Sequence, residues 1–204
     1  MTTPAPPETP TLTGRLVRLE PLGLHHLPAL EAVALDPRIW RYMLVDVRTP
    51  QQLRSWLEAA LAMQASGNAL PWATVVQATG QVVGSTRFVD LDRKHGTVEL
   101  GHTWIAPALH GSGLNPEAKL LQLTYAFETL GLRRVALKTH HENLQSQAAM
   151  RKMGATQEGI FRNHFVMPDG SQRHSVWFSI TREDWPQVKA ALAARAAAYP
   201  LPSA

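Results

Sequence analysis

The sequence lacks cysteine altogether, and it also lacks any long apolar run. Without a thiol there is no thiolate nucleophile, cysteine zinc site or acyl-cysteine intermediate. No stretch approaches the roughly 18 uncharged apolar residues that a membrane-spanning helix needs. The net charge of +4 comes without a Lys/Arg block or zinc-finger spacing, which argues against nucleic acid as a partner. We expect a cytoplasmic protein.

The chain has 204 residues, of which 45% are hydrophobic, and this favours one core and one domain. Residues 1–10 carry four prolines and no apolar run, which predicts a flexible tail rather than a signal peptide or a helix. We expect the main domain over residues 11–182 and an alanine-rich helix and tail over residues 183–204. The nine histidines show no metal-ligand spacing, so we predict no metal site.

Hydrophobic periodicity predicts the elements of this domain. The predicted strands are 15–20, 72–78, 82–91, 97–105, 134–139 and the two arms of a hairpin within 161–180. The predicted helices are 25–35, 49–63, 115–130, 143–153 and one that runs from about 183 to 198. This order predicts an α/β (α+β) class, with one mixed, mostly antiparallel twisted sheet of about seven strands flanked by helices.

Local signals mark the ends of several elements. Pro21 is expected to end the first strand. Asn115 is a candidate N-cap, followed by Pro116 at the first helical position, and Gly131 is a stop signal for the same helix. Asn143 is a candidate N-cap for the next helix.

The most informative segment is His110-Gly111-Ser112-Gly113-Leu114-Asn115-Pro116, between a predicted strand and a predicted helix. Glycines at 111 and 113 allow a tight turn whose amide N–H groups point into one concavity at a helix N-terminus, which suits a pyrophosphate. Lys119, one turn into the helix, can add a cation. A purely structural turn is the alternative interpretation, and the segment lacks the Gly-Lys-Ser/Thr ending of a P-loop.

Several motifs occur here in one particular order across residues 12–182. They are the opening strand Leu12–Leu19, Glu99-Leu100-Gly101-His102, the loop His110–Asn115, Asn143-Leu144-Gln145-Ser146 and Met150-Arg151-Lys152-Met153-Gly154-Ala155. This order resembles the GNAT superfamily of N-acetyltransferases, in particular the RimJ/RimL-like subgroup that acts on ribosomal-protein N-termini. Two positions of the loop depart from the family pattern, since His110 replaces glutamine or arginine and Asn115 replaces glycine or alanine.

The resemblance implies a GNAT-like fold and acetyl-CoA as the acetyl donor. It also implies cofactor contacts by Trp104, Ile105, His110, Gly111, Ser112, Gly113, Leu114, Asn115, Lys119 and Asn143. The contribution of Trp104 and Ile105 would be mostly through the main chain, where their strand parts from the next one. Asn143 would hold the pantetheine arm, besides its role as an N-cap.

The resemblance also implies three candidate catalytic residues. Glu99 and His102 lie on the strand that runs toward the acetyl group, and strand alternation predicts that they face opposite sides of the sheet, so that at most one is the general base. Glu99 is favoured, although each also fits a plain sheet-face residue. Ser146 is the candidate proton donor to the leaving thiolate, with a helix-end serine as the alternative.

The resemblance implies an amine as the acceptor, and it favours a protein N-terminal amine. Small-molecule amines or antibiotics, and a non-catalytic acyl-CoA-binding module, are the alternatives. Four aromatic residues can either line an acceptor pocket or belong to the core: Trp40, Tyr42, Trp56 and Trp72. The oligomeric state is undetermined by the sequence, with a homodimer among the open choices.

Overall fold

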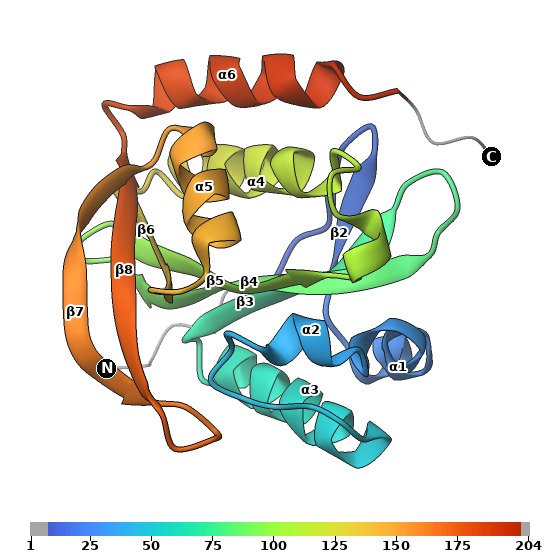
Figure 1. Ribbon diagram of the computed structural model, residues 1–204. Coiled ribbons are helices and arrows are strands. Elements are labelled where there is room, and N and C mark those ends of the chain that lie inside the picture. Colours follow the sequence, from blue (N-terminus) through green and yellow to red (C-terminus); the bar gives the residue numbers. More distant parts are fainter. Residues whose placement is uncertain (1–7, 201–204) are drawn as a thin grey trace, which may run out of the picture.

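The computed structural model describes residues 8–200 as one sheet with helices on both faces (Figure 1). Its strands are β1 (Leu12–Thr13), β2 (Val17–Pro21), β3 (Ala69–Val76), β4 (Val82–Asp92), β5 (Thr97–Ile105), β6 (Arg134–His140), β7 (Thr156–Val166) and β8 (Gln172–Thr181). The spatial order is β1-β2-β3-β4-β5-β6-β8-β7. Among the strands of residues 8–200, only β5 and β6 pair in parallel. The expected class is confirmed, and the strand beyond the expected seven is the two-residue β1.

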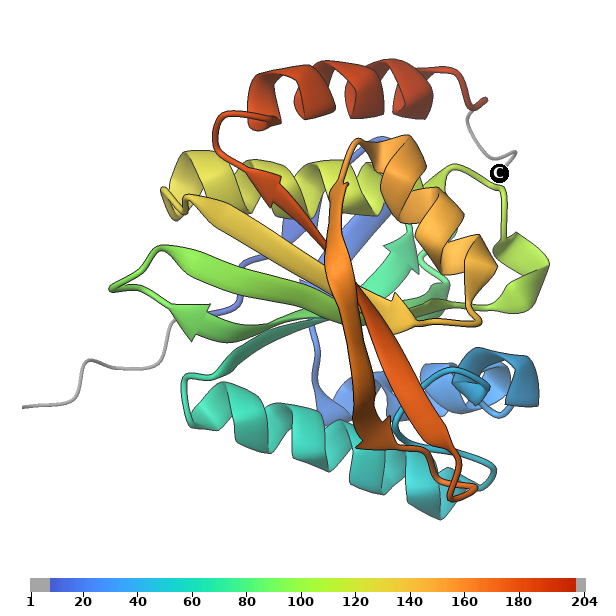
Figure 2. The same ribbon diagram turned by 60° about the vertical axis from the view of Figure 1, so that its left-hand side comes forward.

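Two groups of helices cover the two faces of the sheet (Figures 1 and 2). On one face lie α1 (Leu27–Ala34), α2 (Pro37–Trp40) and α3 (Pro50–Ala65), and on the other lie α4 (Leu114–Thr124), α5 (Leu144–Met153) and α6 (Trp185–Ala197). Shorter turns are η1 (Leu24–His26), η2 (Pro107–Leu109) and the π-helical η3 (Tyr125–Thr129) that continues α4. Each face has its own apolar core. None of these helices is long and apolar enough to cross a membrane.

The beginning of α4 differs from the sequence-based expectation. Gly113, in the left-handed region at φ 84°, is the N-cap residue, so Asn115 lies inside the first turn and does not cap it. Pro116 is consequently the third helical residue rather than the first. This position tolerates proline because the first N–H groups of a helix have no intrahelical acceptor. Pro21, which we expected to lie beyond the first strand, is its last residue.

A buried carboxylate fixes the first turn of α4 against the β1–β2 hairpin. Glu117 accepts hydrogen bonds from the backbone N–H groups of Arg15 at 3.0 Å, Leu16 at 2.6 Å and Val17 at 2.8 Å. Gly14 leaves the space, since a Cβ there would lie 2.6 Å from a Glu117 carboxylate oxygen. The glycine loop before α4 therefore leads into a helix whose first turn is held in place.

The two ends of the described chain pack on the domain. Thr9 is buried and accepts a hydrogen bond from Gln64, and the Pro10 carbonyl accepts one from the Trp72 indole, although both residues belong to the predicted tail. The rest of that tail, residues 1–7, lies outside the described residues, as do residues 201–204. At the other end, Trp185 of α6 stacks on Phe127, so the C-terminal helix shares the core of the main domain.

Candidate active site

The sheet opens between its two parallel strands. β5 and β6 pair only where Thr97–Glu99 lies against Arg134–Ala136, and beyond these residues the two strands no longer pair with each other. A cavity of about 600 Å³ lies at this opening, lined by both strands, by α5 and by the loop before α4. The unpaired edge of β5 exposes backbone groups to the cavity, which is the arrangement expected for an extended ligand that pairs with a strand.

The glycine loop forms one end of the cavity. This end is lined by five of the residues predicted to bind the cofactor: His110, Gly111, Ser112, Gly113 and Asn115. Both glycines have left-handed backbones, with φ of 81° and 84°. Within residues 8–200, the N–H groups of Gly111 and Gly113 have no hydrogen-bond acceptor. These donors, together with the helix N-terminus, provide a site that fits an anion such as a pyrophosphate.

The His110 side chain contacts the backbone of β5. Its Nε2 lies 3.1 Å from the carbonyl oxygen of Ile105, which ends β5. Asn115 instead presents an amide to the cavity, and its buried Oδ1 has no partner within the described residues. At the two positions that depart from the family pattern, His110 therefore braces the loop, and Asn115 has an amide oxygen without a partner among the described residues.

Two residues predicted to bind the cofactor, Leu114 and Lys119, have buried side chains. The Leu114 side chain is buried in the core and does not line the cavity. Lys119 is also buried, and its ammonium donates to Thr103 at 2.8 Å, Gln122 at 3.1 Å and Thr86 at 3.2 Å. Lys119 nevertheless borders the cavity, where these three oxygens hold its ammonium group, and burial lowers its pKa to about 7.

A β-bulge overturns the expectation that Glu99 and His102 face opposite sides of the sheet. Ser85 pairs with Trp104 and Arg87 with Gly101, so one residue of β4 faces two of β5 at this point. His102 adopts a left-handed backbone with φ of 48°. The extra residue shifts the alternation by one, which brings Glu99 and His102 to the same cavity.

Electrostatics distinguish these two residues as proton acceptors. Burial, together with the nearby cations Arg87, Lys138 and Arg173, lowers the pKa of His102 to about 3. This ring is consequently neutral at pH 7 and has little tendency to take a proton. Glu99 forms an ion pair with Lys138 of β6 and is almost fully buried. Of the two, only Glu99 carries a charge that attracts an ammonium group.

The start of α5 lies across the cavity from β5. Asn143 caps the helix, as predicted, by accepting a hydrogen bond from the Ser146 N–H at 3.0 Å. Both side chains line the cavity. The cap uses the amide oxygen, so the amide N–H₂ group remains a donor for a ligand. The side-chain hydroxyl of Ser146 likewise has no hydrogen-bond partner among the described residues, which leaves it available.

The C-terminal helix and the segment just after it add three cavity-lining residues that no sequence motif indicated: Leu192 and Arg195 of α6, and Tyr199 beyond its end. Arg195 forms no ion pair with any residue from 8 to 200. The Arg15 side chain holds this end of the chain by donating to the carbonyls of Ala196 and Tyr199. A lone arginine in an alanine-rich helix carries no local signal, so these residues were missed.

The aromatic residues divide between core and cavity. Trp104 and Ile105 line the cavity at the end of β5, but the Trp104 indole is buried between Trp40 and Trp56, with ring centroids 5.7 and 5.9 Å away. Trp72 is also buried in the core. Of the four aromatics considered for an acceptor pocket, only Tyr42 lines the cavity.

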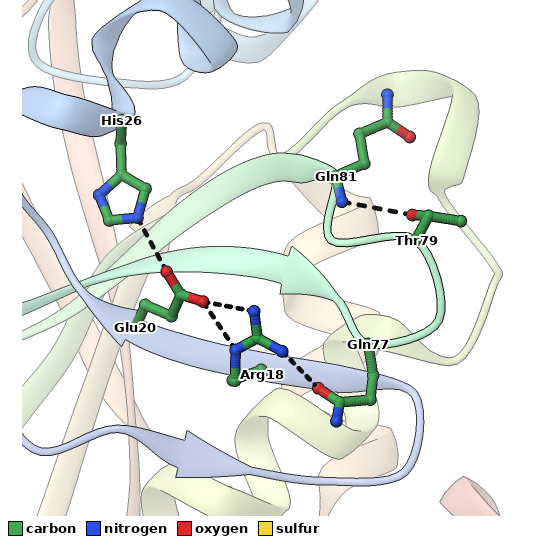
Figure 3. Close-up of polar contacts among 6 residues, drawn as sticks. All are labelled: Arg18, Glu20, His26, Gln77, Thr79 and Gln81. Atoms are coloured by element: carbon green, nitrogen blue, oxygen red, sulfur yellow. Dashed lines mark hydrogen bonds and ion pairs between the residues drawn. The ribbon is translucent and has the colours of Figure 1, made fainter.

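One group of histidine and carboxylate side chains lies outside the cavity. Glu20, His25 and His26 are the only such group in residues 8–200 whose candidate ligand atoms lie within 4.8 Å of one another. Figure 3 shows that the Glu20 carboxylate is already bound by Arg18 and His26, and that Arg18 continues to Gln77. These bonds make the group a polar clamp between β2, η1 and the end of β3.

Comparisons with known proteins agree with this geometry. The profile of a family described as "Acetyltransferase (GNAT) domain" matches residues 16–156. YdaF of Bacillus subtilis, provisionally named a ribosomal N-acetyltransferase, is 31% identical over 106 residues, which are 52% of this chain and 57% of YdaF.

Two solved structures show the same fold. A GCN5-related N-acetyltransferase from Brucella melitensis has a TM-score of 0.85 and 32% identity, over 93% of this chain and 86% of that one. RimJ from Mycobacterium smegmatis, solved with CoA-disulfide, has a TM-score of 0.78 and 21% identity, over 93% and 94%. The chain therefore belongs to the GNAT family of N-acetyltransferases, and it is similar to the RimJ/RimL-like subgroup.

Proposed function

We propose that the protein transfers the acetyl group of acetyl-CoA to a primary amine, by direct attack while both substrates are bound. The observation that carries this proposal is the single cavity lined by the glycine loop at one end and by Glu99 and His102 at the other. Family membership and the CoA-bound relative support it. The cytoplasmic location expected from the sequence stays a prediction.

The residues of the cavity fit a CoA thioester. The free N–H groups of Gly111 and Gly113 would hold its pyrophosphate, the open edge of β5 would pair with its pantetheine amides, and the Asn143 amide would donate to the same arm. Acetyl-CoA supplies an activated carbonyl. The helix N-terminus of α4 attracts the phosphate charge.

In the transfer step, the acceptor nitrogen forms a bond to the thioester carbon and the carbon–sulfur bond breaks. An alkylamine is mostly protonated at pH 7, so it must first lose a proton, and the Glu99 carboxylate is the proposed acceptor, directly or through water. The Ser146 hydroxyl is the proposed donor to the leaving sulfur. The acceptor nitrogen loses two protons as it changes from an ammonium ion to an amide, and the CoA thiol takes up one of them. Each turnover therefore releases one proton to solvent.

Two classes of acceptor are compatible with this site: a protein N-terminal amine and a small-molecule amine. A protein N-terminal amine is favoured by the likeness to YdaF and RimJ. The test is incubation with acetyl-CoA and a panel of N-terminal peptides and small amines, read by CoA thiol release and a mass gain of one acetyl group. Transfer to peptides supports the protein acceptor, and transfer only to small amines replaces it. Tight acetyl-CoA binding without any transfer would make the protein a non-catalytic acyl-CoA-binding module.

A further inference from the structure

The acceptor end of the cavity contains a buried arginine without a carboxylate partner. Arg173 of β8 is 5% exposed and lines the cavity. Within residues 8–200 it forms no ion pair. Its hydrogen bonds are to neutral oxygens only, from Nε to Ser175 Oγ and from one terminal nitrogen to the Tyr42 carbonyl, both at 3.2 Å. Burial of an unpaired charge is costly, so its position calls for an explanation.

The second terminal nitrogen of Arg173 has no partner within the described residues, yet it is not sealed off from solvent. A guanidinium group presents its N–H donors as a planar fork that matches a carboxylate. With Nε and one terminal nitrogen held by the protein, the remaining donors are fixed in direction. Arg173 is thus placed to form an ion pair with the carboxylate of a bound ligand.

The charges around Arg173 favour an acidic acceptor. Glu99 is the only carboxylate on the cavity wall of the described chain, and Lys138 already pairs with it. The two cations Lys138 and Arg173 therefore face one anion, while His102 remains neutral at pH 7. A plain ammonium ion meets a net positive end, whereas an amine that also carries a carboxylate brings the missing negative charge.

We infer that the acceptor is a primary amine bearing a carboxylate, and that Arg173 binds this carboxylate while the amine points toward Glu99. This inference rests on the proposed acetyl transfer and narrows its substrate class. Peptides with an acidic residue near the N-terminus and free amino acids both belong to this class. Arg173 is then a specificity-determining residue.

The test uses matched acceptor pairs that differ only in the charge. One series is the ω-amino acids from glycine to 5-aminopentanoate, each with its carboxamide, and the other is Ser-Glu-Ala-amide with Ser-Gln-Ala-amide. We expect at least one carboxylate member to have a kcat/KM about tenfold or more above its amide. Arg173→Gln is expected to abolish this preference, whereas Arg173→Lys should retain part of it. Arg41→Gln, which removes an exposed cation outside the cavity, should keep the preference.

Two results would overturn the inference while leaving acetyl transfer intact. One is transfer without any preference for the carboxylate members, and the other is a preference that survives Arg173→Gln. Equal losses for both members of a pair are one form of this second result, and they are expected if Arg173 only anchors the Tyr42 loop.

Binding can be tested independently of turnover. Succinate should raise the Tm of the wild-type protein more than succinamide does, and it should inhibit transfer to a neutral amine competitively. If Arg173→Gln fails to fold, Arg173→Lys and the wild-type succinate measurement decide the matter, and an absent succinate effect rejects the inference. Should no acceptor be acetylated although succinate still binds through Arg173, the proposed function fails and the carboxylate site stands.

Discussion

The ring of Tyr199 lies directly over Gly113, so close that a Cβ on Gly113 would come within 2.5 Å of Tyr199 Cγ. These residues are far apart in the chain, and their contact joins the C-terminal segment to the loop proposed to hold the pyrophosphate. Gly113 therefore has two reasons to lack a side chain: its left-handed backbone and the ring above it.

The first prediction separates these two reasons. Gly111 has a similar backbone, with φ of 81°, but nothing lies within 4 Å of the position where its Cβ would be. Gly111→Ala should cost about 1 kcal/mol of unfolding free energy from backbone strain alone. Gly113→Ala should cost more, and it should also weaken acetyl-CoA binding, as measured by denaturant unfolding and by the ligand-induced Tm shift. Equal costs at both positions would show that the Tyr199 contact is unimportant.

A second prediction concerns the general base. Glu99→Gln should lower kcat by about 10²-fold with acetyl-CoA binding retained. His102→Ala should cost less and leave the acidic limb of the pH–rate profile in place, because the low pKa of His102, about 3, keeps it neutral throughout the working range. Loss of that limb in His102→Ala, with a normal profile in Glu99→Gln, would reverse the assignment.

The third prediction separates binding from chemistry at the start of α5. Asn143→Ala should raise the KM for acetyl-CoA and cost ~1 kcal/mol of stability, because the amide both caps the helix and faces the cavity. Asn143→Asp retains the capping oxygen and removes the amide donor, so it should restore stability without restoring KM. Ser146→Ala should lower kcat with little change in KM, since its hydroxyl is proposed to act on charge that develops only as sulfur leaves. An unchanged kcat would leave Ser146 a helix-end residue.

Local signals predicted the parts of the site that depend on neighbours in sequence. The Asn143 cap needs only the N–H of Ser146, and the positive φ of Gly111 and Gly113 follows from glycine itself. The loop and its helix could therefore be located from residues 110–116 alone.

Features that depend on distant partners were not predictable in this way. The bulge that turns His102 toward Glu99 depends on the register between β4 and β5, and simple alternation gave the opposite answer. The isolated Arg195 gave no hint that α6 reaches the cavity. Lys119 looked like a loop cation because its spacing from Gly113 is right, but the oxygens that bind it come from two strands and from its own helix.

The last prediction concerns this buried lysine and the pH dependence of stability. Lys119 donates to the hydroxyl of Thr103, which is the residue after His102, so it binds one of the two β5 residues of the bulge. Its three acceptors are neutral oxygens, and no carboxylate of the described chain offsets the burial that lowers its pKa from 10.5 to about 7. The unfolded chain, in which this lysine is solvated, consequently binds more protons than the folded chain between pH 7 and pH 10.5.

Stability contributed by this group therefore rises with pH across that window, by at most about 1.4 kcal/mol per pH unit, and it is constant below pH 7, where both states are protonated. Lys119→Met removes the linkage, so the difference in unfolding free energy between wild type and variant should grow in favour of wild type from pH 7 to pH 10. Lys94→Met, which replaces an exposed lysine, should give a curve parallel to wild type. Urea unfolding at several pH values measures all three proteins, and parallel curves for Lys119→Met and wild type would show that the buried amine keeps its charge throughout.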